Sequence, residues 1–138
     1  MIIIFAIKAA IKHEASNMTK KIIILGLGRI GGAVGPLLSQ HKGYQVSGAD
    51  IDPVAVEHFA KQFPTQLISD NNFNPILKGH HAVISALTFN ENPLIAQAAL
   101  DNGCSYFDLT EDVRCTNTIK NIAKKALPGQ VFMPQCGL

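Results

Sequence analysis

Three glycines and one aspartate near the start of the chain have a spacing that suits the binding of a diphosphate. Gly26, Gly28 and Gly31 form G-x-G-x-x-G directly after the apolar run 22–25, and Asp50 follows Gly31 by nineteen residues. The first glycine permits a tight turn, the second lets the backbone approach a pyrophosphate, and the third lets a helix sit close to the strand. The helix N-terminus then favours the negative charge. The pattern predicts a dinucleotide-binding β-α-β unit.

The two acids of the segment Asp50-Ile51-Asp52-Pro53 are expected to differ in role. Asp52 precedes a proline, as the N-cap of a helix often does, so its role is structural. Asp50 ends the second strand, where a carboxylate accepts hydrogen bonds from the adenosine ribose and repels a 2′-phosphate. This favours NAD over NADP. Arg29 would partly offset the repulsion if it reached the ribose, although its place in the glycine loop favours a diphosphate contact.

Further cofactor contacts are expected where later strands end. Asp70 closes the third strand and could flank the adenine, although a turn-capping role fits it equally well. Small residues end the fourth strand beside the glycine loop and leave room for a cofactor. In addition to the residues already named, the predicted cofactor contacts are Ile30, Ile51, Asp70, Ala86, Leu87 and Thr88.

No residue of the chain can be assigned a catalytic role from the sequence. Asp108, Glu111 and Asp112 follow the fifth strand, where loop solvation and helix capping are the favoured roles. Cys136 has no identifiable basic partner, so a buried, inert thiol is favoured over a nucleophile. Tyr106 has no lysine four residues later and therefore lacks the Tyr-x-x-x-Lys pair of short-chain dehydrogenases. His80 and His81 are adjacent and would point to opposite faces of a strand, and the other three histidines are scattered, so no metal site is predicted.

Strands and helices alternate along the chain, and this alternation positions the residues above. Apolar and turn patterns predict helices over residues 29–40, 53–63, 92–102 and 117–127, and strands over residues 22–25, 44–49, 65–69, 81–87, 105–109 and 130–133. We therefore expect one α/β domain with a doubly wound, parallel, six-stranded Rossmann-type sheet in the order 3-2-1-4-5-6. Residues 71–79 must cross back over the sheet in about ten residues, near the minimum for a crossover.

The composition is that of a globular protein, with 138 residues, 47% hydrophobic residues and a net charge of +2. So small a charge argues against a nucleic-acid partner. The three cysteines are widely spaced, which argues against a disulfide framework and a zinc site and favours the cytoplasm.

Residues 1–17 are expected to be a peripheral N-terminal extension preceding the dinucleotide-binding domain, residues 18–138. The apolar run 2–7 is too short to span a membrane. A floppy or strand-forming segment is favoured over an interfacial helix. Met18, just before the first strand, would also make a natural start of translation.

The segment AVISALTFNENPLIAQAALDNGCSYFDLTEDV, followed by FMPQCGL, resembles the N-terminal NAD(P)-binding domain of the saccharopine dehydrogenase-like oxidoreductases. The resemblance covers residues 21–138. It implies that the cofactor contacts are Gly26, Gly28, Arg29, Ile30, Gly31, Asp50 and the turn 86–88, with Leu109 and Thr110 toward the nicotinamide. It also implies an amino-acid-type substrate held by a separate catalytic domain, beyond the point where this chain stops, so we expect the chain to be inactive alone.

A second resemblance covers residues 22–57 and leads to a different function. This segment is similar to the nucleotide-sensing domains that regulate potassium transport, in which a bound dinucleotide shifts a conformational equilibrium without hydride transfer. A dependence of oligomeric state on NAD would favour that alternative. Self-association through the sixth strand, at the edge of the sheet, is also expected.

Overall fold

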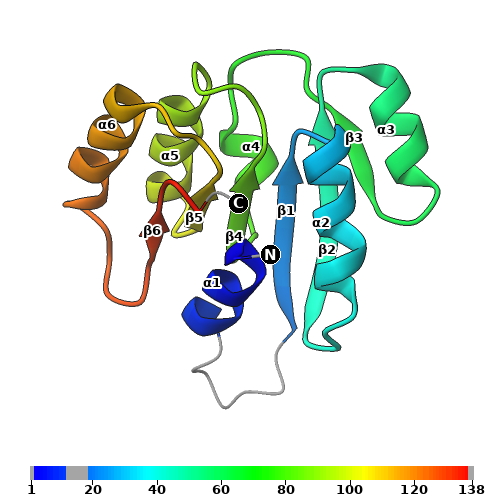
Figure 1. Cartoon of the computed structure of the whole chain (residues 1–138), viewed down its shortest axis with the longest axis horizontal. Coiled ribbons are helices and arrows are strands. Elements are labelled where there is room, and N and C mark those ends of the chain that lie inside the picture. The colour runs from blue at the N-terminus through cyan, green and yellow to red at the C-terminus, as the bar shows by residue number, and fades with distance from the viewer. Residues whose placement is uncertain (1, 12–18, 137–138) are drawn as a thin grey trace.

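The computed structural model describes residues 2–11 and 19–136 and contains a six-stranded parallel sheet in the order β3-β2-β1-β4-β5-β6 (Figure 1). This confirms the predicted doubly wound topology. The strands are β1 (Lys20–Leu25), β2 (Tyr44–Asp50), β3 (Thr65–Leu67), β4 (Ala82–Ser85), β5 (Ser105–Asp108) and β6 (Phe132–Met133). The helices are α1 (Ile2–Ile11), α2 (Arg29–Ser39), α3 (Pro53–Ala60), α4 (Asn74–Leu77), α5 (Asn92–Asp101) and α6 (Val113–Ala123).

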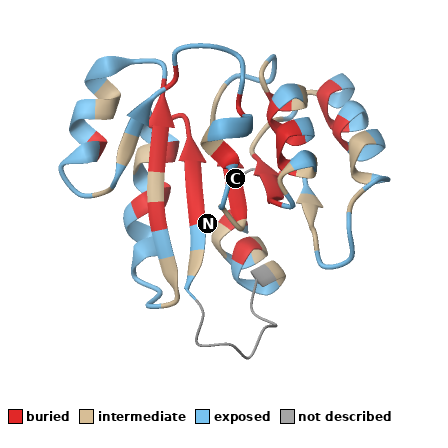
Figure 2. Ribbon diagram, turned by 180° about the vertical axis from the view of Figure 1, so that it is seen from behind, coloured by how far each residue is buried: buried red, intermediate tan, exposed pale blue. Residues whose placement is uncertain are grey.

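The apolar run of β1 lies at the centre of the sheet and is covered on both faces. Ile22 pairs with Val46 of β2 on one side and with Ala82 of β4 on the other. Successive side chains of a strand point to opposite faces. Ile22 and Ile24 accordingly belong to one buried cluster, and Ile23 and Leu25 belong to the other. Figure 2 shows the buried residues concentrated on the central strands. A strand buried on both faces is apolar without alternation, as this one is.

The crossover from β3 to β4 contains a single helical turn, α4, which lets a short connection span the sheet. Leu77 of this turn is fully buried in the same cluster as Ile23. Several predicted strands are shorter than expected, at residues 65–67, 82–85 and 132–133. Just before the sixth strand, Val131 donates its N–H to Ser105 Oγ, and its carbonyl accepts from the Tyr106 N–H of β5.

Helix capping explains where α3 and α6 begin. The predicted start of α3 is confirmed, and that of α6 is wrong. The Asp52 carboxylate accepts a hydrogen bond from the Val54 N–H at 3.0 Å, as expected of the N-cap of α3. The predicted start of the last helix at residue 117 is wrong. Asp112 caps α6 by accepting from the Cys115 N–H at 2.7 Å, so the helix begins at Val113. A cap at this aspartate satisfies one of the unpaired N–H groups of the first turn.

The N-terminal segment is a helix where it is described, so the expected floppy or strand-forming conformation is wrong for Ile2–Ile11. Ile3 and Ile7 are fully buried in the cluster that contains Ile84 and Phe107. Helix α1 lies on the same side of the sheet as α2 (Figure 1). Its buried side chains belong to one cluster with residues of β4, β5 and α2. Residues 12–18, including Met18, lie outside the described part.

Candidate dinucleotide-binding site

The glycine-rich loop joins β1 to α2, and its glycines have different steric surroundings. Gly26 has φ +92°, and a Cβ there would lie 2.7 Å from the Ala86 carbonyl carbon. A Cβ on Gly31 would lie 1.7 Å from the Gly26 carbonyl oxygen. These two glycines are required by the close approach of three backbone segments. A Cβ on Gly28 would meet no atom within 4 Å, so the fold leaves open space at the position predicted to face a diphosphate.

Asp50 lies at the end of β2 and is hydrogen-bonded to the glycine-rich loop. Its Oδ2 accepts from the Leu27 N–H at 2.6 Å, and its Oδ1 accepts from the Asp52 N–H at 3.0 Å. The side chain is buried, with 7% of its surface exposed. The sequence analysis did not predict this bond to the loop. Each carboxylate oxygen keeps a further lone pair, so the arrangement is compatible with a ribose hydroxyl as an additional donor.

Two pockets lie on either side of the turn that follows β4. The first, which we call the Asp70 pocket, has a volume of 360 Å³. It brings four predicted contacts together, and its lining includes Ile51, Asp70, Leu87 and Thr88. These residues follow β2, β3 and β4, whose carboxyl ends meet at one edge of the sheet. Asp70 is exposed at the surface and caps its own turn by accepting from the Asn72 N–H at 2.9 Å.

The second pocket, which we call the Thr110 pocket, has a volume of 210 Å³. Its lining contains five predicted contacts together with Phe89, namely Ile30, Ala86, Leu87, Leu109 and Thr110. Leu87 lines both pockets and therefore lies between them. Sequence reasoning missed Phe89, whose signal was its place directly after the small-residue turn. Arg29 is exposed at the first position of α2 and lines neither pocket.

Polar contacts brace the loop between the two pockets. The Ser85 hydroxyl donates to Asn92 Oδ1 at 2.6 Å, and both side chains are buried. This bond joins the end of β4 to the first turn of α5. Thr88 donates its hydroxyl proton to the Glu91 carboxylate, which closes the loop between them. The turn 86–88 is therefore held at both ends before any ligand binds.

The acidic residues at the end of β5 and after it differ in environment. Glu111 is exposed, and Asp112 caps α6, as the favoured roles predict. Asp108 is completely buried, so loop solvation is wrong for this residue. Burial, reinforced by the charge of Asp108, raises the pKa of the Cys136 thiol to about 11. This thiol is protonated at neutral pH, which fits the inert role predicted for it.

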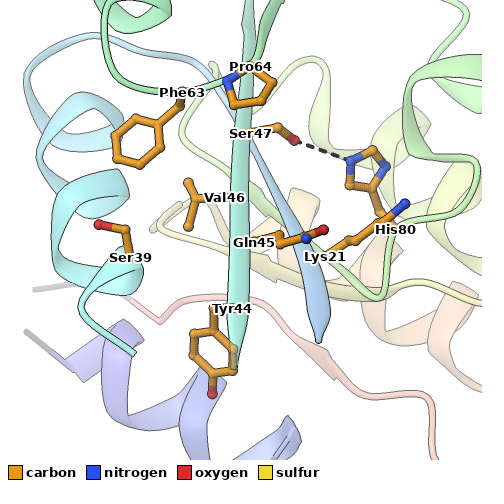
Figure 3. Close-up of a pocket in the computed structure, with 9 residues that line it drawn as sticks. All are labelled: Lys21, Ser39, Tyr44, Gln45, Val46, Ser47, Phe63, Pro64 and His80. Atoms are coloured by element: carbon orange, nitrogen blue, oxygen red, sulfur yellow. Dashed lines mark hydrogen bonds between the residues drawn. The ribbon is translucent and has the colours of Figure 1, made fainter. Parts of the chain in front are cut away.

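A larger pocket of 510 Å³ lies around the amino half of β2, away from the glycine-rich loop (Figure 3). His80 Nε2 lies 3.2 Å from Ser47 Oγ at its wall. Burial is the main cause that lowers the pKa of His80, so the ring is neutral at pH 7. None of the predicted contacts lines this pocket. In open parallel sheets ligands bind at the carboxyl ends of the strands, so the Asp70 and Thr110 pockets are the candidate site despite their smaller volumes.

Within residues 2–11 and 19–136, no three His, Cys, Asp or Glu side chains are grouped as the ligands of a metal ion would be. Over the same part of the chain, no helix has the length and apolar character needed to cross a membrane.

Comparison with known proteins identifies the family to which this chain belongs. The model of a family described as the saccharopine dehydrogenase NADP binding domain matches residues 22–130, which include the loop, Asp50 and both pockets. The chain belongs to this family. The resemblance stated from the sequence is therefore confirmed, and the chain is an NAD(P)-binding domain of Rossmann type.

Similar proteins are longer than this saccharopine dehydrogenase-family chain. The glutamyl-tRNA reductase of Thermoplasma acidophilum is 28% identical over 95 residues, which cover 69% of this chain and 22% of the reductase. Saccharopine dehydrogenase (L-Glu forming) of Saccharomyces cerevisiae superposes with a TM-score of 0.71 at 15% identity, over 84% of this chain and 27% of the enzyme. Shikimate dehydrogenase of Aquifex aeolicus superposes with a TM-score of 0.62 at 16% identity, over 97% of this chain and 48% of the enzyme. At these identities the structural matches show the shared fold.

Proposed function

We propose that this domain binds NAD in preference to NADP, across the carboxyl edge of the sheet. The Asp50 carboxylate carries this proposal, because it is buried at the end of β2 and already bound to the glycine-rich loop. A negative charge held there disfavours a ribose 2′-phosphate and accepts hydrogen bonds from ribose hydroxyls. The preference departs from the family description, which names NADP.

Several groups support the assignment of the two ends of the cofactor. The open space at Gly28 and the N-terminus of α2 suit the diphosphate, which pairs with unbonded N–H groups. We assign the adenosine end to the Asp70 pocket and the nicotinamide end to the Thr110 pocket, with Leu87 between them. When bound, the cofactor supplies hydride chemistry, and the protein contributes orientation and electrostatics.

We further propose that the domain serves an oxidoreductase that acts on an amino-acid-type substrate and that a separate domain supplies the catalytic groups. The family match supports the redox role. The three cysteines are unpaired thiols, which supports a reducing, cytoplasmic setting. The regulatory alternative rested on residues 22–57, whereas the family match extends to residue 130.

Calorimetric titration of the unmutated protein with NADH and NADPH tests the cofactor proposal. We expect both to bind and NADH to bind more tightly. Equal affinities, or tighter NADPH binding, would overturn the NAD preference. Failure to bind either nucleotide would overturn the assignment of the site.

Absorbance of the nicotinamide during incubation with amino-acid substrates tests the catalytic proposal. We expect no turnover by the domain alone, and turnover would contradict the need for another domain. Light scattering with and without NADH addresses the regulatory alternative, which a nucleotide-dependent change of oligomeric state would favour.

A further inference from the structure

Asp108, at the end of β5, is a fully buried carboxylate surrounded by hydrogen-bond donors. Oδ2 accepts from the Tyr106 hydroxyl at 2.6 Å, and Oδ1 accepts from the Thr110 and Gln135 N–H groups at 3.0 Å each. A buried carboxylate is tolerated in a protein only where such donors replace water. Burial, followed by the charge of Asp108, raises the pKa of Tyr106, so its phenol remains a donor at all ordinary pH values.

Asp108 Oδ1 joins two segments that are far apart in the sequence. Thr110 lies two residues after Asp108 and lines the Thr110 pocket beside Leu109. Gln135 lies 27 residues after Asp108, beyond β6. Its φ of +61° lies in the left-handed region that residues other than glycine rarely adopt. The Asp108 carbonyl also accepts from the Cys136 N–H at 2.8 Å, which fixes the same turn a second time.

We propose that Asp108 is a positioning residue that holds the 109–110 wall of the dinucleotide site in place from behind. This inference rests on the proposed function, because it takes the Thr110 pocket as the nicotinamide end. The carboxylate is placed to act through the backbone of Thr110 and to couple this wall to the turn at Gln135. Without an acceptor at this point, two partly buried N–H groups lose their protein partner, and the backbone of the turn shifts as they bind water or another acceptor instead.

A pair of substitutions at this residue separates positioning from bulk stability. Asp108→Ala removes both acceptor oxygens. Asp108→Asn keeps one oxygen for the two N–H groups, and its amide nitrogen can donate to the Tyr106 oxygen. Tyr106→Phe is the matched control, because it removes the donor to Oδ2 and leaves the Oδ1 contacts intact.

The measurement is the affinity for NADH and for ADP-ribose, which lacks only the nicotinamide. We expect Asp108→Ala to weaken NADH binding by about tenfold more than ADP-ribose binding, as the loss of a well-placed hydrogen-bonded turn would cause. Asp108→Asn should recover most of the lost NADH affinity. Tyr106→Phe should leave the ratio of NADH to ADP-ribose affinity at its value in the unmutated protein. An equal effect of Asp108→Ala on both ligands would overturn the proposal. If the unmutated protein binds neither ligand, the proposed function itself fails.

Amide hydrogen exchange on the unmutated protein provides a test if Asp108→Ala does not fold. We expect the amides of Thr110 and Gln135 to be protected in the free protein and to gain protection together when NADH binds. ADP-ribose should leave both unchanged, because it does not fill the nicotinamide end. No response of the Thr110 amide to NADH, or a response of this amide without that of Gln135, would overturn the proposal.

Discussion

The Leu27 N–H, inside the glycine-rich loop, donates a 2.6 Å hydrogen bond to Asp50 Oδ2, at the end of the neighbouring strand. The aspartate therefore shapes the loop in addition to its predicted role at a ribose. A hydrogen bond to a charged, buried acceptor is stronger than one between neutral groups. The position of the loop and the charge at the ribose site consequently depend on one side chain.

Asp50→Ala should lower both stability and cofactor discrimination. The substitution leaves the buried Leu27 N–H without its acceptor, which costs about 2 kcal/mol of the free energy of unfolding. NADH affinity should fall by about tenfold, and NADPH affinity should fall less, because the repulsion of the 2′-phosphate is also removed. Urea unfolding and calorimetric titration measure the two effects.

Asp52→Ala is the control for that experiment, since this carboxylate caps α3 and is exposed. We expect a loss of about 1 kcal/mol from the missing cap. The ratio of NADH to NADPH affinity should remain that of the unmutated protein. If both substitutions narrowed the ratio equally, Asp50 would have no special role in selectivity.

Gly28→Ala should lower NADH affinity with little loss of stability, whereas Gly31→Ala should mainly lower stability. The methyl group at residue 28 meets no protein atom within 4 Å. Gly28→Ala should therefore fold with a loss within about 1 kcal/mol, the scale of an N-cap change. NADH affinity should fall by at least about tenfold, because the methyl group occupies the space predicted for the diphosphate. Unchanged NADH binding would show that no diphosphate lies there.

Gly31→Ala places a methyl carbon 1.7 Å from the Gly26 carbonyl oxygen, so the backbone must shift. We expect a loss of about 3 kcal/mol, at the upper end of measured overpacking effects. Thermal or urea unfolding gives the value. A fully stable Gly31→Ala protein would contradict the packing of the loop against α2.

The helix α1 offers a test of whether the N-terminal segment belongs to the folded unit. Ile7 is fully buried, whereas Phe5 on the same helix is 75% exposed. Ile7→Ala should cost about 2 to 4 kcal/mol of stability, as deletions of buried methyl groups do. Phe5→Ala should remain within about 0.5 kcal/mol. Equal and small effects would show that α1 does not pack on the sheet in solution.

The buried thiols predict a loss of stability at alkaline pH. Burial raises the pKa of Cys104 to about 12, and burial with the charge of Asp108 raises that of Cys136 to about 11, from 9.0 in each case. A raised folded-state pKa contributes stability that is fully present below the unfolded pKa and is lost as the pH rises toward the folded pKa. Urea unfolding should therefore show stability falling from about pH 9, up to about pH 11 for Cys136 and about pH 12 for Cys104.

Thiol labelling gives an independent measurement of the same burial. All three cysteines are buried, and none should react with a thiol reagent in the native protein near neutral pH. Denaturant should expose all of them at once. Rapid native labelling of Cys136 would contradict the inert role of this residue.

The sequence by itself determined the sheet topology and, apart from α1 and the single turn α4, the order of the elements. A strand buried on both faces, a glycine triplet and a helix cap such as Asp52 are local patterns, because each depends on neighbours a few residues away. Steric constraints on crossovers then leave few possible strand orders. The start of α6 is the exception, because the Asp112 cap places it at Val113, whereas the prediction places it at residue 117.

Only the tertiary structure decided which groups the buried carboxylates hold. Asp50 reaches Leu27 across 23 residues, and Asp108 reaches Gln135 across 27 residues. It also decided that α1 covers β4 and β5 and that Leu87 separates the two pockets. These relationships depend on which strand ends the sheet order brings together. Hydrophobic periodicity encodes each element separately and does not specify the partner of a polar side chain across the fold.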